Sequence, residues 1–192
     1  MLILGVDPGT RILGYSLLQT DPKPQMVLMD VLYLKNMEDY NLRIRTVFDS
    51  MCSVIDQYHP SHLSIEAPFF GKNVQSMLKL GRAQGVTIAA AMSRNMTFSE
   101  YEPATIKQYI TGSGGATKEQ VLAMLQAHLG VDLQPRYLDA TDALAAAYCH
   151  YLVSTNPMAD IRAQLRPAKQ RKAKNASWSD YVKQNPDVVS RD

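Results

Sequence analysis

The chain opens with a short apolar run that stops abruptly at an acidic residue. Leu2–Val6 is apolar throughout, and Asp7-Pro8-Gly9-Thr10 follows at once as a cluster of turn-forming residues. Two more short strands are expected at Ile12–Leu18 and Met26–Leu34, with a proline-containing loop between them. Three strands joined by such short turns form an antiparallel meander. The start of the chain therefore predicts one edge of a β-sheet.

The spacing of apolar residues changes from a strand period to a helical period near Asp39. The elements expected after this point are a helix from Asp39 to Pro60, a strand at 62–66, a long helix at about 73–94, a strand at 97–101, a helix at 103–109, a helix capped by Thr117 and a last helix at about 139–153. This order predicts an α/β fold in which a mixed sheet is flanked by helices.

Composition excludes several classes of protein. Hydrophobic residues make up 46% of the 192 residues, which is an ordinary globular value, and no apolar run approaches the roughly 20 residues of a membrane span. The N-terminus has no basic region of the kind that opens a signal peptide. Cys52 and Cys149 are the only cysteines, which excludes a disulfide scaffold. A soluble protein of the cytoplasm, with no membrane contact, is expected.

Charge divides the chain into two parts. Residues 162–192 carry 8 basic and 3 acidic side chains, whereas residues 1–161 carry 12 basic and 15 acidic ones. The C-terminal part also has few large apolar residues and cannot bury much surface. We expect one domain over residues 1–158 and a basic, disordered tail over residues 159–192. The tail is either a solubilising extension or an electrostatic arm for a polyanion.

Four acidic residues lie at expected ends of strands and helices. Asp7 and Glu66 end two strands, and Asp139 and Asp142 lie three residues apart at the start of the last helix. Taken singly, each has a structural explanation as a turn residue, an exposed strand end, a helix cap or a partner for the helix dipole. Taken together they predict a site for Mg²⁺ or Mn²⁺, which prefer oxygen ligands. Two such ions activate a water and stabilise the leaving oxygen of a phosphodiester.

Four sequence blocks resemble the RuvC family of Holliday junction resolvases. They are Gly5–Tyr15, Ile65–Asn73, Leu80–Val86 and Asp139–Ala145, and they follow one another in family order. The resemblance implies a ribonuclease H-like fold and a homodimer that makes paired, symmetric, Mg²⁺-dependent nicks in a four-way DNA junction during recombination and repair. It also implies a branch-migration motor of the RuvA and RuvB type as a partner.

The resemblance implies roles for particular residues. Asp7, Glu66, Asp139 and Asp142 are the expected catalytic acids, holding two Mg²⁺ ions that Mn²⁺ can replace. The family places an aromatic wedge at Phe69 and basic residues at Lys107 and Lys118, beside the active site. Phe70 is equally compatible with DNA contact and with the core.

Three further residues are expected to contact the DNA backbone because of where they stand in the sequence. Lys72 and Asn73 stand at the start of the long helix, and Arg11 stands in the first turn. Two features depart from the family pattern. Ala67-Pro68 follows Glu66 where the family often has Gln, and the tail extends past the usual family end.

Other functions are compatible with parts of the sequence. A ribonuclease H-like nuclease acting on flaps or RNA has the same acids, and a non-catalytic junction-binding protein shares the fold. Gly81 and Gly85 lie on one stripe of the long helix and indicate close approach of another backbone, which is either the sheet or a second subunit. The glycine-rich segment 112–118 is not a phosphate-binding P-loop, because Thr117 replaces the glycine that must precede the lysine.

Overall fold

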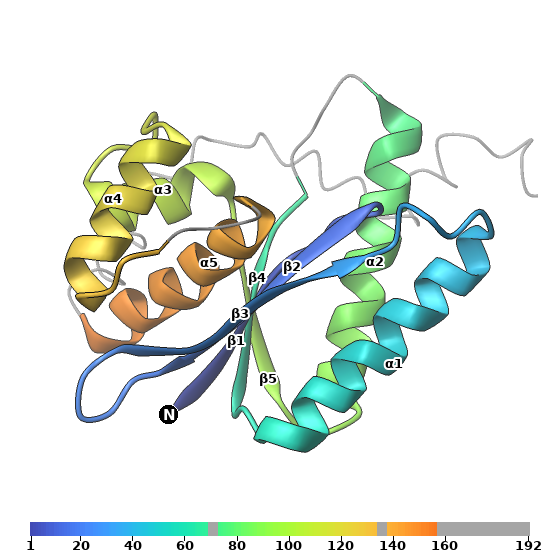
Figure 1. Cartoon of the computed structure of the whole chain (residues 1–192), viewed down its shortest axis with the longest axis horizontal. Coiled ribbons are helices and arrows are strands. Elements are labelled where there is room, and N and C mark those ends of the chain that lie inside the picture. Colours follow the sequence, from blue (N-terminus) through green and yellow to red (C-terminus); the bar gives the residue numbers. More distant parts are fainter. Residues whose placement is uncertain (69–72, 134–137, 157–192) are drawn as a thin grey trace, which may run out of the picture. The chain divides into compact units, whose positions relative to one another are not determined.

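A mixed five-stranded sheet forms the centre of the described structure, a computed structural model that covers residues 1–68, 73–133 and 138–156. The strands lie in the spatial order β3-β2-β1-β4-β5 (Figure 1). Their bounds are β1 Leu2–Asp7, β2 Ile12–Gln19, β3 Gln25–Tyr33, β4 His62–Glu66 and β5 Thr97–Tyr101. β1, β2 and β3 pair antiparallel, and β1, β4 and β5 pair parallel. The predicted meander and the predicted mixed sheet are therefore confirmed.

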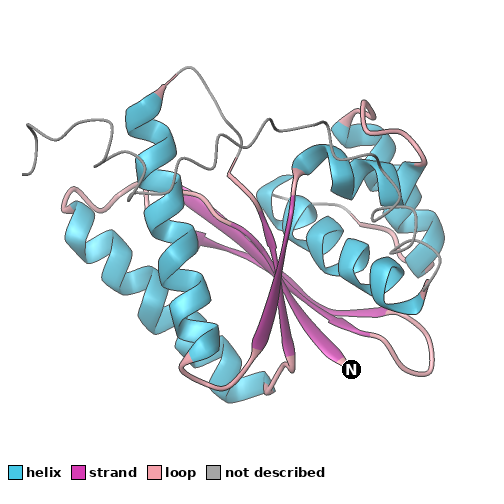
Figure 2. Ribbon diagram, turned by 180° about the vertical axis from the view of Figure 1, so that it is seen from behind, coloured by secondary structure: helices cyan, strands magenta, loops and turns pink. Residues whose placement is uncertain are grey.

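Helices cover both faces of this sheet. Their bounds are α1 Tyr40–Tyr58, α2 Val74–Met92, α3 Pro103–Thr111, α4 Lys118–Leu129 and α5 Leu138–Thr155. Figure 2 shows α1 and α2 on one side of the strands and α3, α4 and α5 on the other. The order of strands and helices is the predicted one, and most ends differ from the prediction by only one or two residues. α4 has the expected capping box between Thr117 and Gln120.

Alternation along the central strands divides the apolar residues between two cores. Leu4 and Val6 of β1 pack with α1 and α2, whereas Ile3 packs with α3, α4 and α5. Successive side chains of a strand point to opposite faces of a sheet. Gly5 and Asp7 therefore lie on the face that Ile3 occupies, which is the face covered by α5.

α5 lies unusually close to the two strands beneath it. A Cβ atom on Gly14 of β2 would overlap the backbone carbonyl of Asp139, and a Cβ atom on Gly5 would overlap that of Ala143. On β4, the Ser64 hydroxyl donates a hydrogen bond of 2.6 Å to the Ala146 carbonyl. Small residues on three neighbouring strands thus let the helix backbone rest directly on the sheet.

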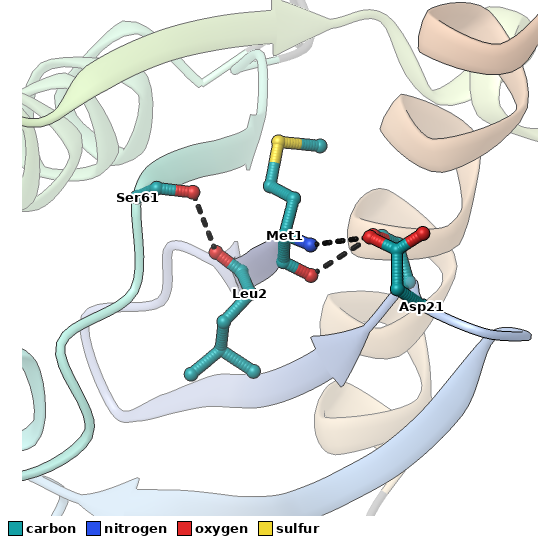
Figure 3. A network of polar contacts seen from close by, with 5 residues as sticks. Met1, Leu2, Asp21 and Ser61 are labelled. Atoms are coloured by element: carbon teal, nitrogen blue, oxygen red, sulfur yellow. Dashed lines mark hydrogen bonds and ion pairs between the residues drawn. The ribbon is translucent and has the colours of Figure 1, made fainter.

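Polar contacts fix the opposite end of β1, as Figure 3 shows. The N-terminal amine of Met1 lies 2.9 Å from Asp21 in the turn between β2 and β3. Ser61, just before β4, donates to the Leu2 carbonyl through both its backbone N–H at 2.9 Å and its hydroxyl at 3.3 Å. These contacts anchor β1 between its two neighbours in the sheet.

The described residues include no helix that is both long enough and apolar enough to cross a membrane. Cys52 and Cys149 are both buried free thiols. The expected domain boundary after residue 158 and the basic tail lie outside the described residues.

The close approach of α5 predicts that Gly14→Ala is destabilising. The added methyl group meets the backbone of α5 at Asp139, and overpacking of this kind costs about 1–3 kcal/mol. Gly115→Ala is the matched control, because the nearest heavy atom to its Cβ position outside its chain neighbours is the Ser113 hydroxyl oxygen at 3.9 Å, an ordinary van der Waals distance. Chemical denaturation measures both changes. A Gly14→Ala variant as stable as the parent protein contradicts the packing described here.

Candidate active site

Two of the four predicted acids lie at the ends of neighbouring parallel strands. Asp7 is the last residue of β1 and Glu66 is the last residue of β4. Val6 pairs with Ile65 in the register of these strands, so the two acids follow directly at the same edge of the sheet. Both point to the face covered by α5, since Gly5 and Ser64, two residues earlier in each strand, contact α5. The strand pairing alone brings these carboxylates together.

The other two acids come from the first turn of α5. Asp139 and Asp142 are three residues apart and share one side of the helix. Gly14 lies against the backbone of Asp139, and Gly14 pairs with Asp7 across β1 and β2. The start of α5 therefore lies beside Asp7. Asp142 is largely buried, with its side chain 20% exposed.

Two predicted basic residues lie beside these acids. Lys118, at the start of α4, donates a short hydrogen bond from its amine to the Asp142 carboxylate. Lys107 of α3 faces the same small cavity, of about 130 Å³. The residues lining this cavity, called here the acid pocket, are Glu66, Pro103, Ile106, Lys107, Lys118, Val121, Asp142 and Ala145.

Burial and mutual repulsion change the acidity of the two strand-end carboxyls. Burial raises the pKa of Asp7 to about 8, and the charges of Glu66, Asp142 and Asp139 add to the effect. Burial and the charge of Asp142 raise the pKa of Glu66 to about 7. Burial by itself would lower the pKa of Lys118, but its hydrogen bond to Asp142 and the surrounding acids raise it instead. The acids are therefore close enough to repel one another electrostatically, and the nearby positive charge does not fully neutralise them.

The donor chemistry of these side chains fits a hard divalent cation. All four are carboxylates, and an ion of charge +2 supplies the counter-charge that Asp7 and Glu66 lack. Among residues 1–68, 73–133 and 138–156, however, no three His, Cys, Asp or Glu side chains form a ready-made metal site. Like charges without a cation between them repel, and Lys118 holds Asp142. The carboxylates are neighbours, but they do not form a closed set of ligands.

A second pocket adjoins the acids on the side of Asp139. It has a volume of about 380 Å³ and is lined by Thr10, Arg11, Ile12, Lys35 and Asp139. Arg11 was a sequence prediction, but Lys35 was not. The antiparallel register, in which Ile12 pairs with Tyr33, brings the residues just outside these strand ends together, and the sequence did not indicate this register.

Of the remaining residues predicted to contact DNA, the structure describes only Asn73. Asn73 is exposed and caps α2, where its side-chain oxygen accepts a hydrogen bond of 3.0 Å from the Ser76 backbone N–H. Phe69 and Lys72 lie outside the described residues, as does Phe70. After Glu66 the chain stays tied to the sheet through Ala67, whose N–H donates to the Tyr101 carbonyl at 2.9 Å. Ala67, the residue after Glu66, is therefore held at the edge of the sheet.

Carboxylates at the ends of adjacent central strands, completed by acids from a helix lying across them, define a class of protein. This class is the ribonuclease H-like nucleases, whose sheet has the mixed strand order found here. The family model "Crossover junction endodeoxyribonuclease RuvC" matches residues 3–150. The chain belongs to the RuvC family.

Individual relatives agree with this assignment. The chain is 45% identical to the crossover junction endodeoxyribonuclease RuvC of Bacteroides fragilis, over 98% of this chain and 95% of the relative. Identity to the protein of the same name from Porphyromonas gingivalis is also 45%, with coverage of 98% and 96%. The structure is similar to that of RuvC from Thermus thermophilus in complex with a Holliday junction substrate. The TM-score is 0.75, with 28% identity and coverage of 80% of this chain and 94% of that one.

The raised pKa of Asp7 predicts how stability depends on pH without divalent metal. The pKa is about 8 in the folded state and 3.8 in the unfolded chain, so stability falls as pH rises from about 4 through 8. Asp7→Asn removes this ionisation and is expected to stabilise the metal-free protein at pH 8, by on the order of 2 kcal/mol. Mg²⁺ is expected to raise the melting temperature of the parent protein more than that of the variant.

Thermal unfolding at pH 5 and pH 8, with chelator or with Mg²⁺, tests this expectation. Asp49→Asn is the control, because Asp49 is an exposed acid of α1 that pairs only with Arg45 one turn away among the described residues. A metal-free Asp7→Asn variant that melts below its parent at pH 8 contradicts the electrostatic account.

Proposed function

We propose that this protein resolves four-way DNA crossover junctions as a homodimer, making paired symmetric nicks in recombination and repair. The observation that carries the proposal is the acid pocket, where Glu66 and Asp142 lie with Lys107 and Lys118 beside Asp7. Its support beyond the site is family membership over residues 3–150 and similarity to a RuvC in complex with a Holliday junction. The proposed location of this activity is the cytoplasm.

Asp7, Glu66, Asp139 and Asp142 are the proposed metal ligands, and Mg²⁺ is the proposed ion, with Mn²⁺ as a substitute. Two such ions in a carboxylate site supply an activated water and stabilise the oxygen that leaves the phosphodiester. The four acids come from rigid elements of the fold, as metal ligands require. Two are fixed by the strand ends and two by α5, so neither set moves independently of the core.

The lysines have a complementary role in this proposal. Lys118 neutralises Asp142 in the absence of DNA, and its side chain remains 53% exposed. Lys107 lines the same cavity and makes no ion pair within the described residues. A phosphate entering the acid pocket therefore meets two ammonium groups, which offset its charge against the carboxylates and stabilise the charge that develops during cleavage.

The outer face of α2 is the proposed dimer interface, where a second copy of the chain binds. Nothing lies within 4 Å of a Cβ atom built on Gly81 or Gly85, so packing on the sheet does not account for these glycines. Val74, Leu78 and Met92 of the same helix are 63%, 54% and 58% exposed. A two-fold dimer presents two equivalent sites, which matches a junction with two equivalent strands to cut.

The decisive experiment uses a labelled synthetic four-way junction and a linear duplex of the same sequence, each with Mg²⁺ and with chelator. Paired symmetric nicks in the junction alone, dependent on Mg²⁺, are the expected result. Tight junction binding without nicks under any divalent metal supports a non-catalytic junction-binding protein instead. Cleavage of flaps or RNA in preference to junctions supports the other nuclease specificities.

Asp7→Asn and Glu66→Gln are expected to abolish nicking while junction binding is largely retained. Each change removes a proposed metal ligand but no phosphate contact, so the rate falls by about a hundredfold or more. Single-turnover cleavage and gel-shift titration in chelator measure the two properties separately. Asp49→Asn, in an exposed ion pair of α1, is the control and is expected to cut normally. Full nicking activity in either active-site variant contradicts the assignment.

The basic tail is proposed to be an electrostatic arm for DNA. Deleting residues 162–192, which carry 8 basic and 3 acidic side chains, is expected to weaken junction binding mainly at low salt. Charge attraction over this range fades as salt shortens the Debye length. Unchanged affinity at low salt would show that the tail has no part in DNA binding.

A branch-migration motor of the RuvA and RuvB type is a further proposed partner of this protein.

A further inference from the structure

The pocket of Arg11 and Lys35 contains two exposed cations next to the acid-rich site. Arg11 precedes β2 and Lys35 follows β3, so antiparallel pairing brings both to the end of the sheet where Asp7 lies. Neither residue makes an ion pair among the described residues, whereas Arg45, Arg94 and Lys118 each do. Positive charge is therefore available at this position for an external anion.

Hydrogen bonds to backbone carbonyls hold the walls of this pocket in place. The Leu34 N–H donates to the Arg11 carbonyl at 2.8 Å, which joins the two segments that carry the cations. Arg43 of α1 donates to the Met37 carbonyl at 2.6 Å and to the Thr10 carbonyl at 3.4 Å. The Lys35 amine lies 5.9 Å from the centre of the Tyr33 ring. The two cations thus project from a braced loop pair, which reduces the cost of ordering them around a ligand.

The first turn of α5 contributes a carboxylate to this pocket and another to the acid pocket. Asp139 lines this pocket and Asp142 lines the acid pocket. The two acids are three positions apart in the helix, a rise of about 4.5 Å. Lysines thus lie on one side of the acids, at Lys107 and Lys118, and Arg11 and Lys35 lie on the other. A polyanionic strand crossing the acids meets positive charge on both sides.

We propose that Arg11 and Lys35, with Thr10, form a subsite for the phosphate that adjoins the scissile phosphate on the cleaved strand. The ligand class is a DNA phosphodiester, and the subsite fixes which phosphate of the strand reaches the carboxylates. This inference rests on the proposed function. Arg11 and Lys35 are positioning residues, because they lie beside the reacting group and do not contact it.

Salt-dependent binding provides the first test. In chelator, Arg11→Ala and Lys35→Ala are each expected to weaken junction binding about threefold to tenfold at low salt. The Arg11→Ala/Lys35→Ala double variant is expected to reduce the slope of log affinity against log salt by about 0.9, the value for one phosphate contact, and each single variant by less. Lys23→Ala is the matched control, since Lys23 is an exposed lysine in the turn at the opposite end of β2 and β3. Losses no larger than those of Lys23→Ala overturn the inference.

A neutral backbone probe locates the contact. Single methylphosphonate groups are placed one at a time at phosphates on either side of the cut. In the parent protein, one position next to the scissile phosphate is expected to weaken binding about threefold to tenfold. In the Arg11→Ala/Lys35→Ala double variant, that substitution is expected to have no further effect, because the cations that met the phosphate are gone. A penalty that is unchanged in the double variant overturns the subsite.

Two other outcomes are distinguishable. Variants that change only the Mg²⁺ concentration needed for half-maximal nicking, with normal salt slopes, show that the cations serve Asp139 and not DNA, which overturns the subsite alone. A parent protein that neither binds nor nicks junctions overturns the proposed function, and the subsite with it.

Discussion

The direct contact between α5 and the central strands is the constraint on which the rest of the site depends. Gly14 and Gly5 leave no side chain between the helix backbone and β2 and β1, and Ser64 donates to the helix from β4. Only at this short separation do the acids of the first helical turn reach those of the strand ends. Any residue larger than glycine at position 14 would meet the backbone at Asp139. The packing of α5 on the sheet therefore also fixes the positions of the acids.

The electrostatics of the site follow from that packing. Burial and the proximity of the carboxylates disfavour their charged forms when no counter-ion is present. The pKa of Asp7 is therefore raised to about 8 and that of Glu66 to about 7. Lys118 offsets part of this through its hydrogen bond to Asp142. The site is thus a compact acidic patch bordered by bases. Such an arrangement attracts a divalent cation at its centre and phosphates at its edges.

Much of the fold was predictable from local signals. The meander, the order of strands and helices and the capping box at Thr117 were all confirmed, because turn residues, hydrophobic period and helix caps act over a few residues. Arg11 was also predicted from the sequence, but its proximity to Lys35 was not. That pairing depends on the register between β2 and β3, and neither residue signals the register by itself. Asn73, expected to contact DNA, has a described role as the cap of α2.

The sequence by itself identified four acidic residues as candidates for the active site and showed which family the chain resembles. It placed Asp7 and Glu66 at strand ends and Asp139 and Asp142 three residues apart at a helix start, because each position depends on local patterns. Only the tertiary structure decided that these acids meet. The acids come together because β1 pairs with β4 in parallel and because α5 packs closely on the sheet. These contacts join residues separated by more than 130 positions in the chain. Contacts between residues so far apart arise from packing of the whole core, and no short stretch of sequence encodes them.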